Sequence, residues 1–275
     1  MTPPASQLRA VVFDWAGTLI DFGSLAPMGA FVKLFERHGV EITVADARAP
    51  MGLPKWDHIH ALGRRPHVAA QWQRVRGRAF DDTDVDALYA EFTPMNAEAV
   101  RDHSALVPGA LDVVAALRAR GVKIGSTTGY NREIMDVVVP LAQRQGLVVD
   151  CLVCADDVAQ NRPSPLGMYR CFVDLEVWPA HRVVKVDDTV PGLMEGRHAG
   201  CWTVGVAASG NACGLTWVQW SALDEALRAS HRERATQQLR AAQPDYVIDT
   251  VADLLRVVDD IERRIDEGAR PPTAG

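Results

Sequence analysis

FDWAGT, residues 13–18, directly follows the apolar run Ala10-Val11-Val12 and is the most informative stretch of this sequence. An aspartate that ends a short buried strand lies at the carboxyl edge of a sheet, where open parallel sheets bind their ligands. With Gly17 and Thr18 just beyond it, Asp14 is suited to attack phosphorus as a nucleophile. Enzymes of this kind usually carry a second acid two residues later, but position 16 is alanine. Either the site is inactive, or its chemistry does not need the second acid.

Outward from this stretch, short apolar segments alternate with amphipathic ones. We expect strands at residues 9–14, 122–126, 151–154, 183–187, 202–206 and 245–249. We expect helices at 108–120, 131–145, 164–174, 190–199, 221–242 and 250–266. This alternation predicts an α/β fold with a Rossmann-like parallel sheet that is covered by helices on both faces.

The first two predicted strands are separated by residues 15–121, a stretch far too long for a single crossover. The intervening sequence has helical periodicity, for example in APMGAFVKLFERHG, where Phe31, Leu34 and Phe35 share one face. Thr43 followed three residues later by Asp46 indicates a capped helix start. We therefore predict an α-helical cap domain at residues 23–103, inserted into a core domain formed by 1–22 and 104–275.

The composition excludes several classes of function. The 275 residues carry a net charge of -6, so no overall basic field favours nucleic acid as a partner. No apolar run approaches the ~20 residues needed to span a bilayer. The N-terminus, MTPPASQLRA, lacks the basic and apolar regions of a secretory signal. We expect a cytoplasmic protein that acts on a small molecule and has neither a nucleic-acid nor a membrane partner.

Polar groups follow each of the first four predicted core strands. They are Asp14, Thr128-Gly129, Arg162 and the pair Asp187-Asp188. Carboxylates can hold Mg²⁺, Thr128 and the Gly129 amide can bind phosphate oxygens, and Arg162 supplies a matching cation. Each group alone is more often part of a turn, but four of them in order at strand ends indicate phosphorus chemistry.

The order of these polar groups along the chain resembles that of a known family. FDWAGT, STTG, Arg162-Pro163 and VDD resemble the four motifs of the haloacid dehalogenase superfamily. A closer resemblance, to the phosphonoacetaldehyde hydrolase (phosphonatase) family, runs from about residue 9 to 265. It is carried by FDWAGTLIDFG, APMGLPKWDHIHAL, KIGSTTGYNREIMD, NRPSPLGMYRC and VKVDDTVPGLMEGRHAG. Its most specific element is the lysine of MGLPK, Lys55, which ordinary phosphatases of the superfamily do not have.

The resemblance implies a hydrolase that cleaves the carbon–phosphorus bond of phosphonoacetaldehyde to acetaldehyde and phosphate. It implies that Asp14 becomes an aspartyl-phosphate and that Mg²⁺ is bound by Asp14, the Ala16 carbonyl and an acid of the VDD motif. We interpret Asp188 as that direct ligand and Asp187 as an indirect one. The resemblance also suggests a homodimer. The sequence departs from many relatives at Gly192, where a further acid is common, and at Arg162, where lysine is common.

Alanine at position 16 fits this chemistry. A phosphate monoester loses an alkoxide, which an acid can protonate, whereas cleavage of a carbon–phosphorus bond needs an electron sink. A lysine amine that condenses with the aldehyde provides that sink as an iminium. Lys55 is the candidate, because the apolar residues before it can desolvate its amine and lower its pKa. His58, three residues on along the same helix face, is either a proton shuttle or a structural histidine.

Two other functions remain open from the residues alone. A capped phosphatase or phosphomutase acting on a small phosphoester would share the fold, but predicts an acid at position 16 and does not need Lys55. A catalytically silent binding protein would tolerate Ala16, but has no need to keep Asp14, Lys55, Arg162 and Asp188 together.

Overall fold

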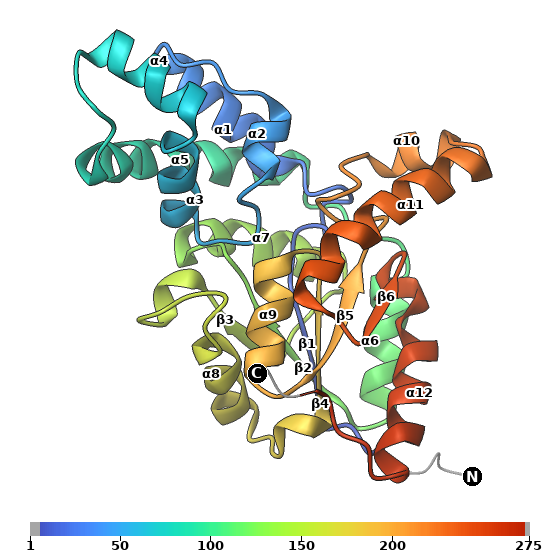
Figure 1. Cartoon of the computed structure of the whole chain (residues 1–275). Coiled ribbons are helices and arrows are strands. Elements are labelled where there is room, and N and C mark those ends of the chain that lie inside the picture. Colours follow the sequence, from blue (N-terminus) through green and yellow to red (C-terminus); the bar gives the residue numbers. More distant parts are fainter. Residues whose placement is uncertain (1–5, 273–275) are drawn as a thin grey trace.

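The computed structural model describes residues 6–272 and has a six-stranded sheet at its centre (Figure 1). The strand order is β3-β2-β1-β4-β5-β6, and every neighbouring pair is parallel. The strands are β1 (Ala10–Phe13), β2 (Lys123–Thr127), β3 (Cys151–Val153), β4 (Val183–Asp187), β5 (Trp202–Val206) and β6 (Tyr246–Ile248). The order places β1 and β4 side by side in the middle, so the acids that follow these two strands lie next to each other.

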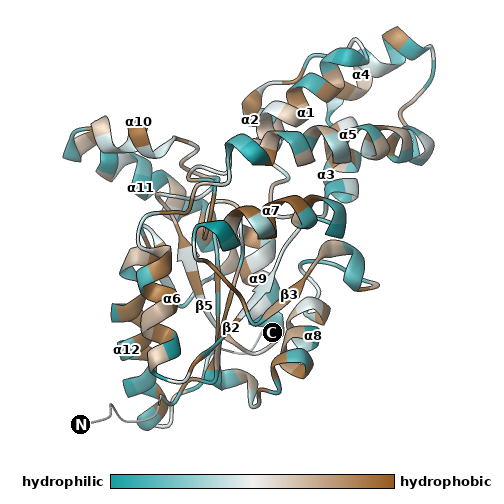
Figure 2. Cartoon of the chain, turned by 180° about the vertical axis from the view of Figure 1, so that it is seen from behind, coloured by the Kyte–Doolittle hydropathy of each residue, from teal (hydrophilic) through white to brown (hydrophobic). Residues whose placement is uncertain are grey.

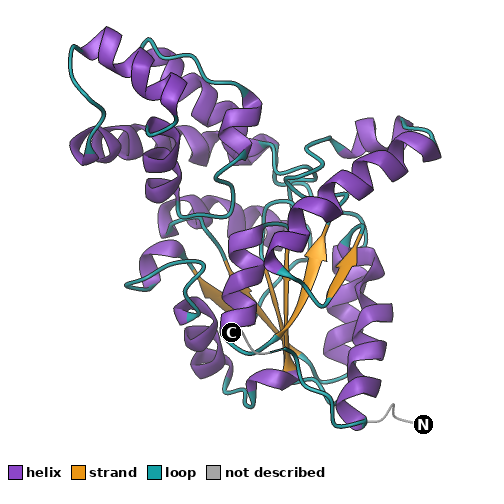
Figure 3. Cartoon of the chain, viewed as in Figure 1, coloured by secondary structure: helices purple, strands orange, loops and turns teal. Residues whose placement is uncertain are grey.

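Helices cover both faces of this sheet, as Figure 3 shows. Val11 and Phe13 of β1 pack into one apolar cluster with α6 (Ala110–Ala119), α7 (Arg132–Arg144) and α12 (Leu254–Asp266). Ala10 and Val12 point to the opposite face and pack against α8 (Leu166–Leu175). On that second face α9 (Val190–His198) contacts β4 and β5. The predicted α/β architecture is confirmed.

Five helices form the cap over the carboxyl edge of the sheet (Figure 1). They are α1 (Ala26–Arg37), α2 (Val44–Arg48), α3 (Lys55–Gly63), α4 (Pro66–Arg76) and α5 (Asp82–Asp102). Phe31, Leu34 and Phe35 are buried in a separate apolar cluster made entirely of cap residues. The Thr43–Asp46 capping box is present at the start of α2. Because this insert has a core of its own, we propose that residues 23–103 are a distinct domain.

The structure corrects several predicted helix bounds: the helices expected at 164–174 and 250–266 begin at Leu166 and Leu254. The helix expected at 108–120 begins at Ala110, so Pro108 lies before it. The helix expected at 221–242 is interrupted, giving α10 (Trp217–Ala222) and α11 (Glu225–Leu239). The chain is extended at Leu223, and the Asp224 side chain accepts a hydrogen bond from the Leu227 N–H, which starts a new helix.

The helices carry hydrophilic and hydrophobic residues along their length (Figure 2), as expected of helices with one solvated face. Between residues 6 and 272, none of them combines the length and the apolar character needed to cross a bilayer.

Candidate active site

A small pocket lies where the carboxyl edge of the sheet meets the cap. Its empty space, mouth included, is about 320 Å³. Core and cap residues both line it: Asp14, Ala16, Ser24, Pro27, Met51, Gly52, Leu53, Lys55, Thr128, Gly129, Tyr130, Arg162, Asp188 and Thr189. The structure thus brings together every residue that the sequence predicted for the site except His58.

Two acids, Asp14 and Asp188, line this pocket, and a third, Asp187, is buried beside them. Asp14 follows β1, Asp187 ends β4 and Asp188 comes next, and one carboxylate oxygen of each lies within 4.8 Å of the others. All three are buried. Burial, together with the neighbouring Asp187, raises the pKa of Asp14 to about 6. Burial and the carboxylates of Asp14 and Asp187 raise the pKa of Asp188 well above its ordinary value. A bound cation would relieve this repulsion.

The two acids of the VDD motif have different surroundings. Asp187 Oδ1 accepts hydrogen bonds from the N–H and the hydroxyl of Thr189, at 3.0 and 2.7 Å. Its Oδ2 lies 3.0 Å from the Lys185 ammonium. Asp188 Oδ2 accepts from the Asn211 N–H at 2.7 Å, whereas its buried Oδ1 has no partner among the residues described. Asp187 Oδ2 also lacks a hydrogen-bond partner, but it is paired with the Lys185 and Arg162 cations. Asp188 Oδ1 has no such ion pair among the residues described and is the oxygen available to a metal.

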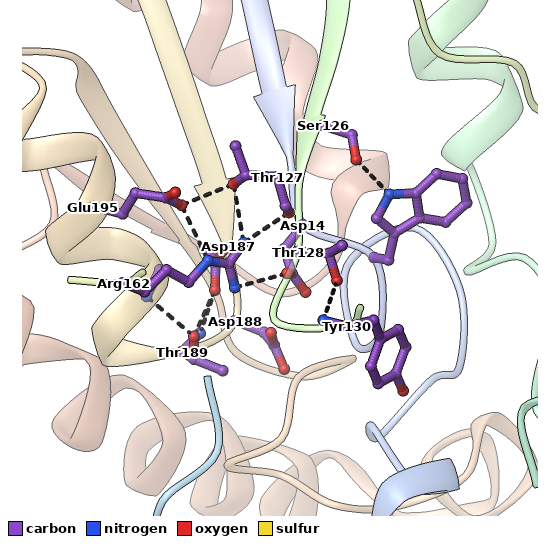
Figure 4. Close-up of polar contacts among 12 residues, drawn as sticks. Asp14, Ser126, Thr127, Thr128, Tyr130, Arg162, Asp187, Asp188, Thr189 and Glu195 are labelled. Atoms are coloured by element: carbon purple, nitrogen blue, oxygen red, sulfur yellow. Dashed lines mark hydrogen bonds and ion pairs between the residues drawn. The ribbon is translucent and has the colours of Figure 1, made fainter. Parts of the chain in front are cut away.

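Arg162 connects the acids to helix α9, as Figure 4 shows. Its Nη1 lies 2.9 Å from Asp14 Oδ1, and its Nε lies 3.0 Å from Glu195 Oε2. Its Nη2 donates to the Thr127 carbonyl at 2.7 Å. The Thr127 hydroxyl in turn donates to Glu195 at 2.8 Å and accepts from Lys185 at 2.6 Å. These contacts fix the guanidinium beside Asp14.

Lys185 and Glu195 are site residues that the sequence analysis did not identify. A signal for the first was present, because VVKVD places a lysine inside a strand that is otherwise apolar and buried on both faces. Glu195 gave no comparable signal, since acids are ordinary on helices. Both side chains are buried, and buried charges require partners.

The formal charges of the site suit a divalent cation. Four buried carboxylates, those of Asp14, Asp187, Asp188 and Glu195, surround the two cations Arg162 and Lys185. With all four carboxylates ionised and the amine of Lys55 neutral, the site would carry an excess of two negative charges, and repulsion among these acids contributes to the raised pKa values of Asp14 and Asp188 in the metal-free protein. The donor set, the buried free oxygen of Asp188 and this excess charge fit Mg²⁺.

The predicted phosphate-binding residues follow β2. The Thr128 hydroxyl accepts a hydrogen bond from the Tyr130 N–H at 3.1 Å, so the turn is held in place from within (Figure 4). Gly129 faces the cap: a Cβ at this position would lie only 3.1 Å from the Leu53 carbonyl oxygen. The core loop and the cap backbone thus approach so closely that a side chain at position 129 would push them apart.

Lys55 is the first residue of α3 and enters the pocket from the cap side. It is only 4% exposed, and its Nζ lies 3.7 Å from Met51 Sδ and 5.1 Å from the centre of the Tyr130 ring. Burial lowers its pKa from 10.5 to about 8, although Asp14 acts in the opposite direction. A substantial fraction of this amine is therefore neutral near pH 8, the form that can attack a carbonyl.

His58 lies inside the cap rather than on the pocket wall. Its ring stacks on Phe31 with centroids 4.0 Å apart, and its Nε2 lies 2.8 Å from the Ala47 carbonyl oxygen. Burial and the nearby Lys55 lower its pKa well below the ordinary value, so the ring is neutral. These contacts are those of a structural residue, and the role as proton shuttle stays a prediction.

The class of protein follows from this fold and site. A family model described as haloacid dehalogenase-like hydrolase matches residues 8–200. A capped β-phosphoglucomutase from Clostridium difficile shares the fold, with a TM-score of 0.70 at 15% identity over 94% of this chain and 99% of the other.

More similar proteins narrow this class. The chain is 49% identical to a phosphonoacetaldehyde hydrolase of Bordetella pertussis over 96% of both chains. It is 50% identical to one of Paraburkholderia xenovorans, over 96% of this chain and 99% of the relative. The crystal structure of a phosphonoacetaldehyde hydrolase-like protein from Oleispira antarctica matches with a TM-score of 0.95 at 42% identity, covering 98% of this chain and 97% of that one. The chain belongs to the phosphonoacetaldehyde hydrolase family of the haloacid dehalogenase-like hydrolases.

Proposed function

We propose that this protein hydrolyses phosphonoacetaldehyde to acetaldehyde and phosphate. One observation carries the proposal: a buried lysine from the cap and a buried aspartate from the core line the same small pocket, beside an alanine at the position of the second acid. The names of the relatives that match this chain over nearly its whole length support it.

The phosphonate would bind against the positive side of the pocket. Arg162, the Thr128 hydroxyl and the Gly129 amide would contact its oxygens. Mg²⁺ would be held by Asp14, Asp188 and the carbonyl of Ala16, and it would offset the charge of these acids and of the phosphonate. Because the cap closes over the site, bulk water is kept from the reacting atoms.

Lys55 would act first, as a nucleophile toward carbon. Its neutral amine attacks the aldehyde, and loss of water gives an imine whose nitrogen is then protonated. Burial favours this step because it lowers the pKa of the amine to about 8. The resulting iminium lies two bonds from phosphorus, where it can accept the electron pair of the carbon–phosphorus bond.

Asp14 would then attack phosphorus. One of its oxygens forms a bond to phosphorus as the carbon–phosphorus bond breaks, and the released electron pair converts the iminium to an enamine. Protonation at carbon and hydrolysis of the resulting imine release acetaldehyde and restore Lys55. Water finally hydrolyses the aspartyl-phosphate to phosphate and free Asp14. No step calls for an acid at position 16, in agreement with Ala16.

The test combines an assay with chemical trapping. An acetaldehyde-coupled assay on phosphonoacetaldehyde with Mg²⁺ should show turnover. Borohydride added with substrate should reduce the imine and fix an adduct on Lys55, detectable by peptide mass mapping. Lys55→Arg should form no adduct and lose turnover, because a guanidinium stays protonated. Lys33→Arg, a change at an exposed lysine of the cap, is the matched control and should behave as wild type.

The alternative function gives the opposite result. A capped phosphatase or phosphomutase should hydrolyse or isomerise a small phosphoester such as glycolaldehyde phosphate equally well in the wild type and in Lys55→Arg. Turnover of phosphonoacetaldehyde with an unmodified Lys55 would remove the electron sink from the mechanism.

We also propose, from the family resemblance alone, that the protein is a homodimer. Sedimentation equilibrium of the purified protein would show twice the mass of the 30.0 kDa chain.

A further inference from the structure

Arg48, the last residue of α2, is a cap residue whose guanidinium lies on the core. Its Nη1 donates to the carbonyl oxygen of Gly23 at 2.9 Å, and to the carbonyl and side-chain oxygens of Asn211 at 3.0 Å each. Its Nη2 lies 3.4 Å from the Gly214 carbonyl oxygen. One cationic side chain thus binds oxygens from Gly23, where the cap begins, and from the loop after β5.

Gly214 is needed for this contact. Its φ is +68°, a conformation that few side chains adopt, and a Cβ there would lie 2.7 Å from the central guanidinium carbon of Arg48. The loop is therefore shaped to receive the guanidinium closely.

Asn211 links this contact to the acids of the site. Its backbone N–H donates to Asp188 Oδ2 at 2.7 Å, while its side-chain amide lies 3.4 Å from the Arg48 carbonyl oxygen. A single residue therefore separates the cap from Asp188. The N–H bond also selects which oxygen of Asp188 is held by the protein and which stays available.

The same residues line a second cleft beside the pocket. This open cleft is lined by Arg48, Asn211 and Gln238, and it shares Met51, Leu53, Asp188 and Thr189 with the pocket. The Arg48–Asn211 contact thus lies on the wall of a cleft that reaches Asp188 from the side of the cap–core junction.

We propose that Arg48 and Asn211 form a closure latch that orients Asp188 for metal binding when the cap docks on the core. Both are positioning residues, because they act through Asp188 and touch no reacting atom. Docking of Arg48 fixes the Asn211 backbone, and that backbone fixes Asp188 Oδ2. Undocking releases the Asn211 oxygens and loosens the hold on Asp188. The inference rests on the proposed function in one respect, that Asp188 is a ligand of Mg²⁺.

The test measures metal affinity without turnover. Binding of Mn²⁺ as a paramagnetic probe, and its displacement by Mg²⁺, should be followed in wild type, Arg48→Lys, Arg48→Gln and Asn211→Ala. We expect both Arg48 variants to bind Mn²⁺ about 5- to 20-fold more weakly, with a fall in kcat larger than any change in KM. Because a lysine cannot reach several carbonyls at once, Arg48→Lys should not restore the affinity.

Arg65→Gln is the matched control, since Arg65 pairs with Asp46 inside the cap at 3.0 Å. It should leave the Mn²⁺ affinity unchanged. Arg48→Gln combined with Asn211→Ala should weaken binding no further than Arg48→Gln alone, as expected for two residues that act through one contact. Circular dichroism of each variant separates loss of the latch from unfolding.

Two different results would contradict the latch, and they differ in what they mean for the proposed function. Folded Arg48 variants that bind Mn²⁺ within twofold of wild type, or a double variant whose losses simply add, would overturn the latch while leaving the proposed function intact. A wild-type protein that binds no divalent metal would instead overturn the proposed function at its metal site, and the latch with it.

Discussion

Arg162 bridges Asp14 and Glu195, with its Nη1 2.9 Å from the first carboxylate and its Nε 3.0 Å from the second. The guanidinium therefore ties the proposed nucleophile to a residue of α9. A phosphonate that binds at this position would meet a cation whose direction is already fixed. Such a fixed cation needs no rearrangement as charge develops on phosphorus.

Replacing Arg162 by lysine should break this bridge, because one ammonium cannot contact Asp14, Glu195 and the Thr127 carbonyl together. We expect Arg162→Lys to lower kcat/KM at least tenfold while the protein still folds. Steady-state kinetics on phosphonoacetaldehyde checks this, with Arg170→Lys, at an exposed arginine of α8, as the control. Retention of wild-type kcat/KM would show that position 162 needs only a positive charge, as in the relatives that carry lysine.

Asp14→Asn should abolish turnover, because an amide cannot form the acyl phosphate. The change keeps the shape of the side chain and removes one of the buried negative charges, so folding should not suffer. Imine formation at Lys55 should persist in this variant and can be followed by borohydride trapping. Activity surviving within tenfold of wild type would exclude Asp14 as the nucleophile.

Asp187 and Asp188 should respond differently to replacement by alanine. Asp188→Ala removes the acid with a free oxygen, so we expect it to weaken Mg²⁺ binding more than Asp187→Ala does. Asp187→Ala leaves the buried Lys185 without its nearest carboxylate, 3.0 Å away, and should cost about 3–5 kcal/mol of folding free energy. Isothermal titration with Mg²⁺ and urea unfolding of both variants give the comparison. A larger loss of Mg²⁺ affinity in Asp187→Ala would reverse the assignment of the ligand.

Much of this site could be predicted because parallel strands end at one edge of a sheet. Asp14, Thr128 and Asp188 each follow a strand, so a correct strand assignment is enough to bring them together. Lys55 came from a different source, since the family resemblance and the apolar residues before it, rather than a strand end, distinguished it from an ordinary surface lysine. Its burial depends on how the cap docks, which no local pattern encodes.

The missed residues depend on contacts between distant parts of the chain. Glu195 acquires its role from its contacts with Arg162 and Lys185, and Arg48 meets Asn211 across 163 positions of sequence. The local sequence pattern of a strand or a helix does not show which distant residue its side chains will meet. The break between α10 and α11 is a different case. Asp224 was a visible capping signal within a segment whose helical composition continues on both sides.

The rate of imine formation should depend on pH through Lys55. Its amine reacts only when neutral, and its pKa is lowered to about 8. We therefore expect adduct formation with borohydride to rise as the pH increases through about 8 and to level off above it. The dependence should be measured in Asp14→Asn, where the later steps are blocked. Because the Asp14 carboxylate raises the pKa of Lys55, its removal should move the midpoint below the wild-type value. A midpoint near 10.5, the ordinary value for lysine, would mean that the amine is solvated in the protein.

The same burial predicts that Lys55 destabilises the folded protein at neutral pH. The pKa of its amine is about 8 in the folded chain and about 10.5 when unfolded, so the unfolded state binds more protons between these two values. The free energy of unfolding should therefore rise with pH across this window.

At pH 7 Lys55→Met should stabilise the metal-free protein by up to about 3 kcal/mol, from roughly 1.4 kcal/mol for each pH unit between the two values. The gain should vanish near pH 10.5, and Lys33→Met, at an exposed position, should change stability by less than about 0.5 kcal/mol. Urea unfolding at both pH values measures these differences, and a Lys55→Met variant no more stable than wild type at pH 7 would contradict a desolvated amine at this position.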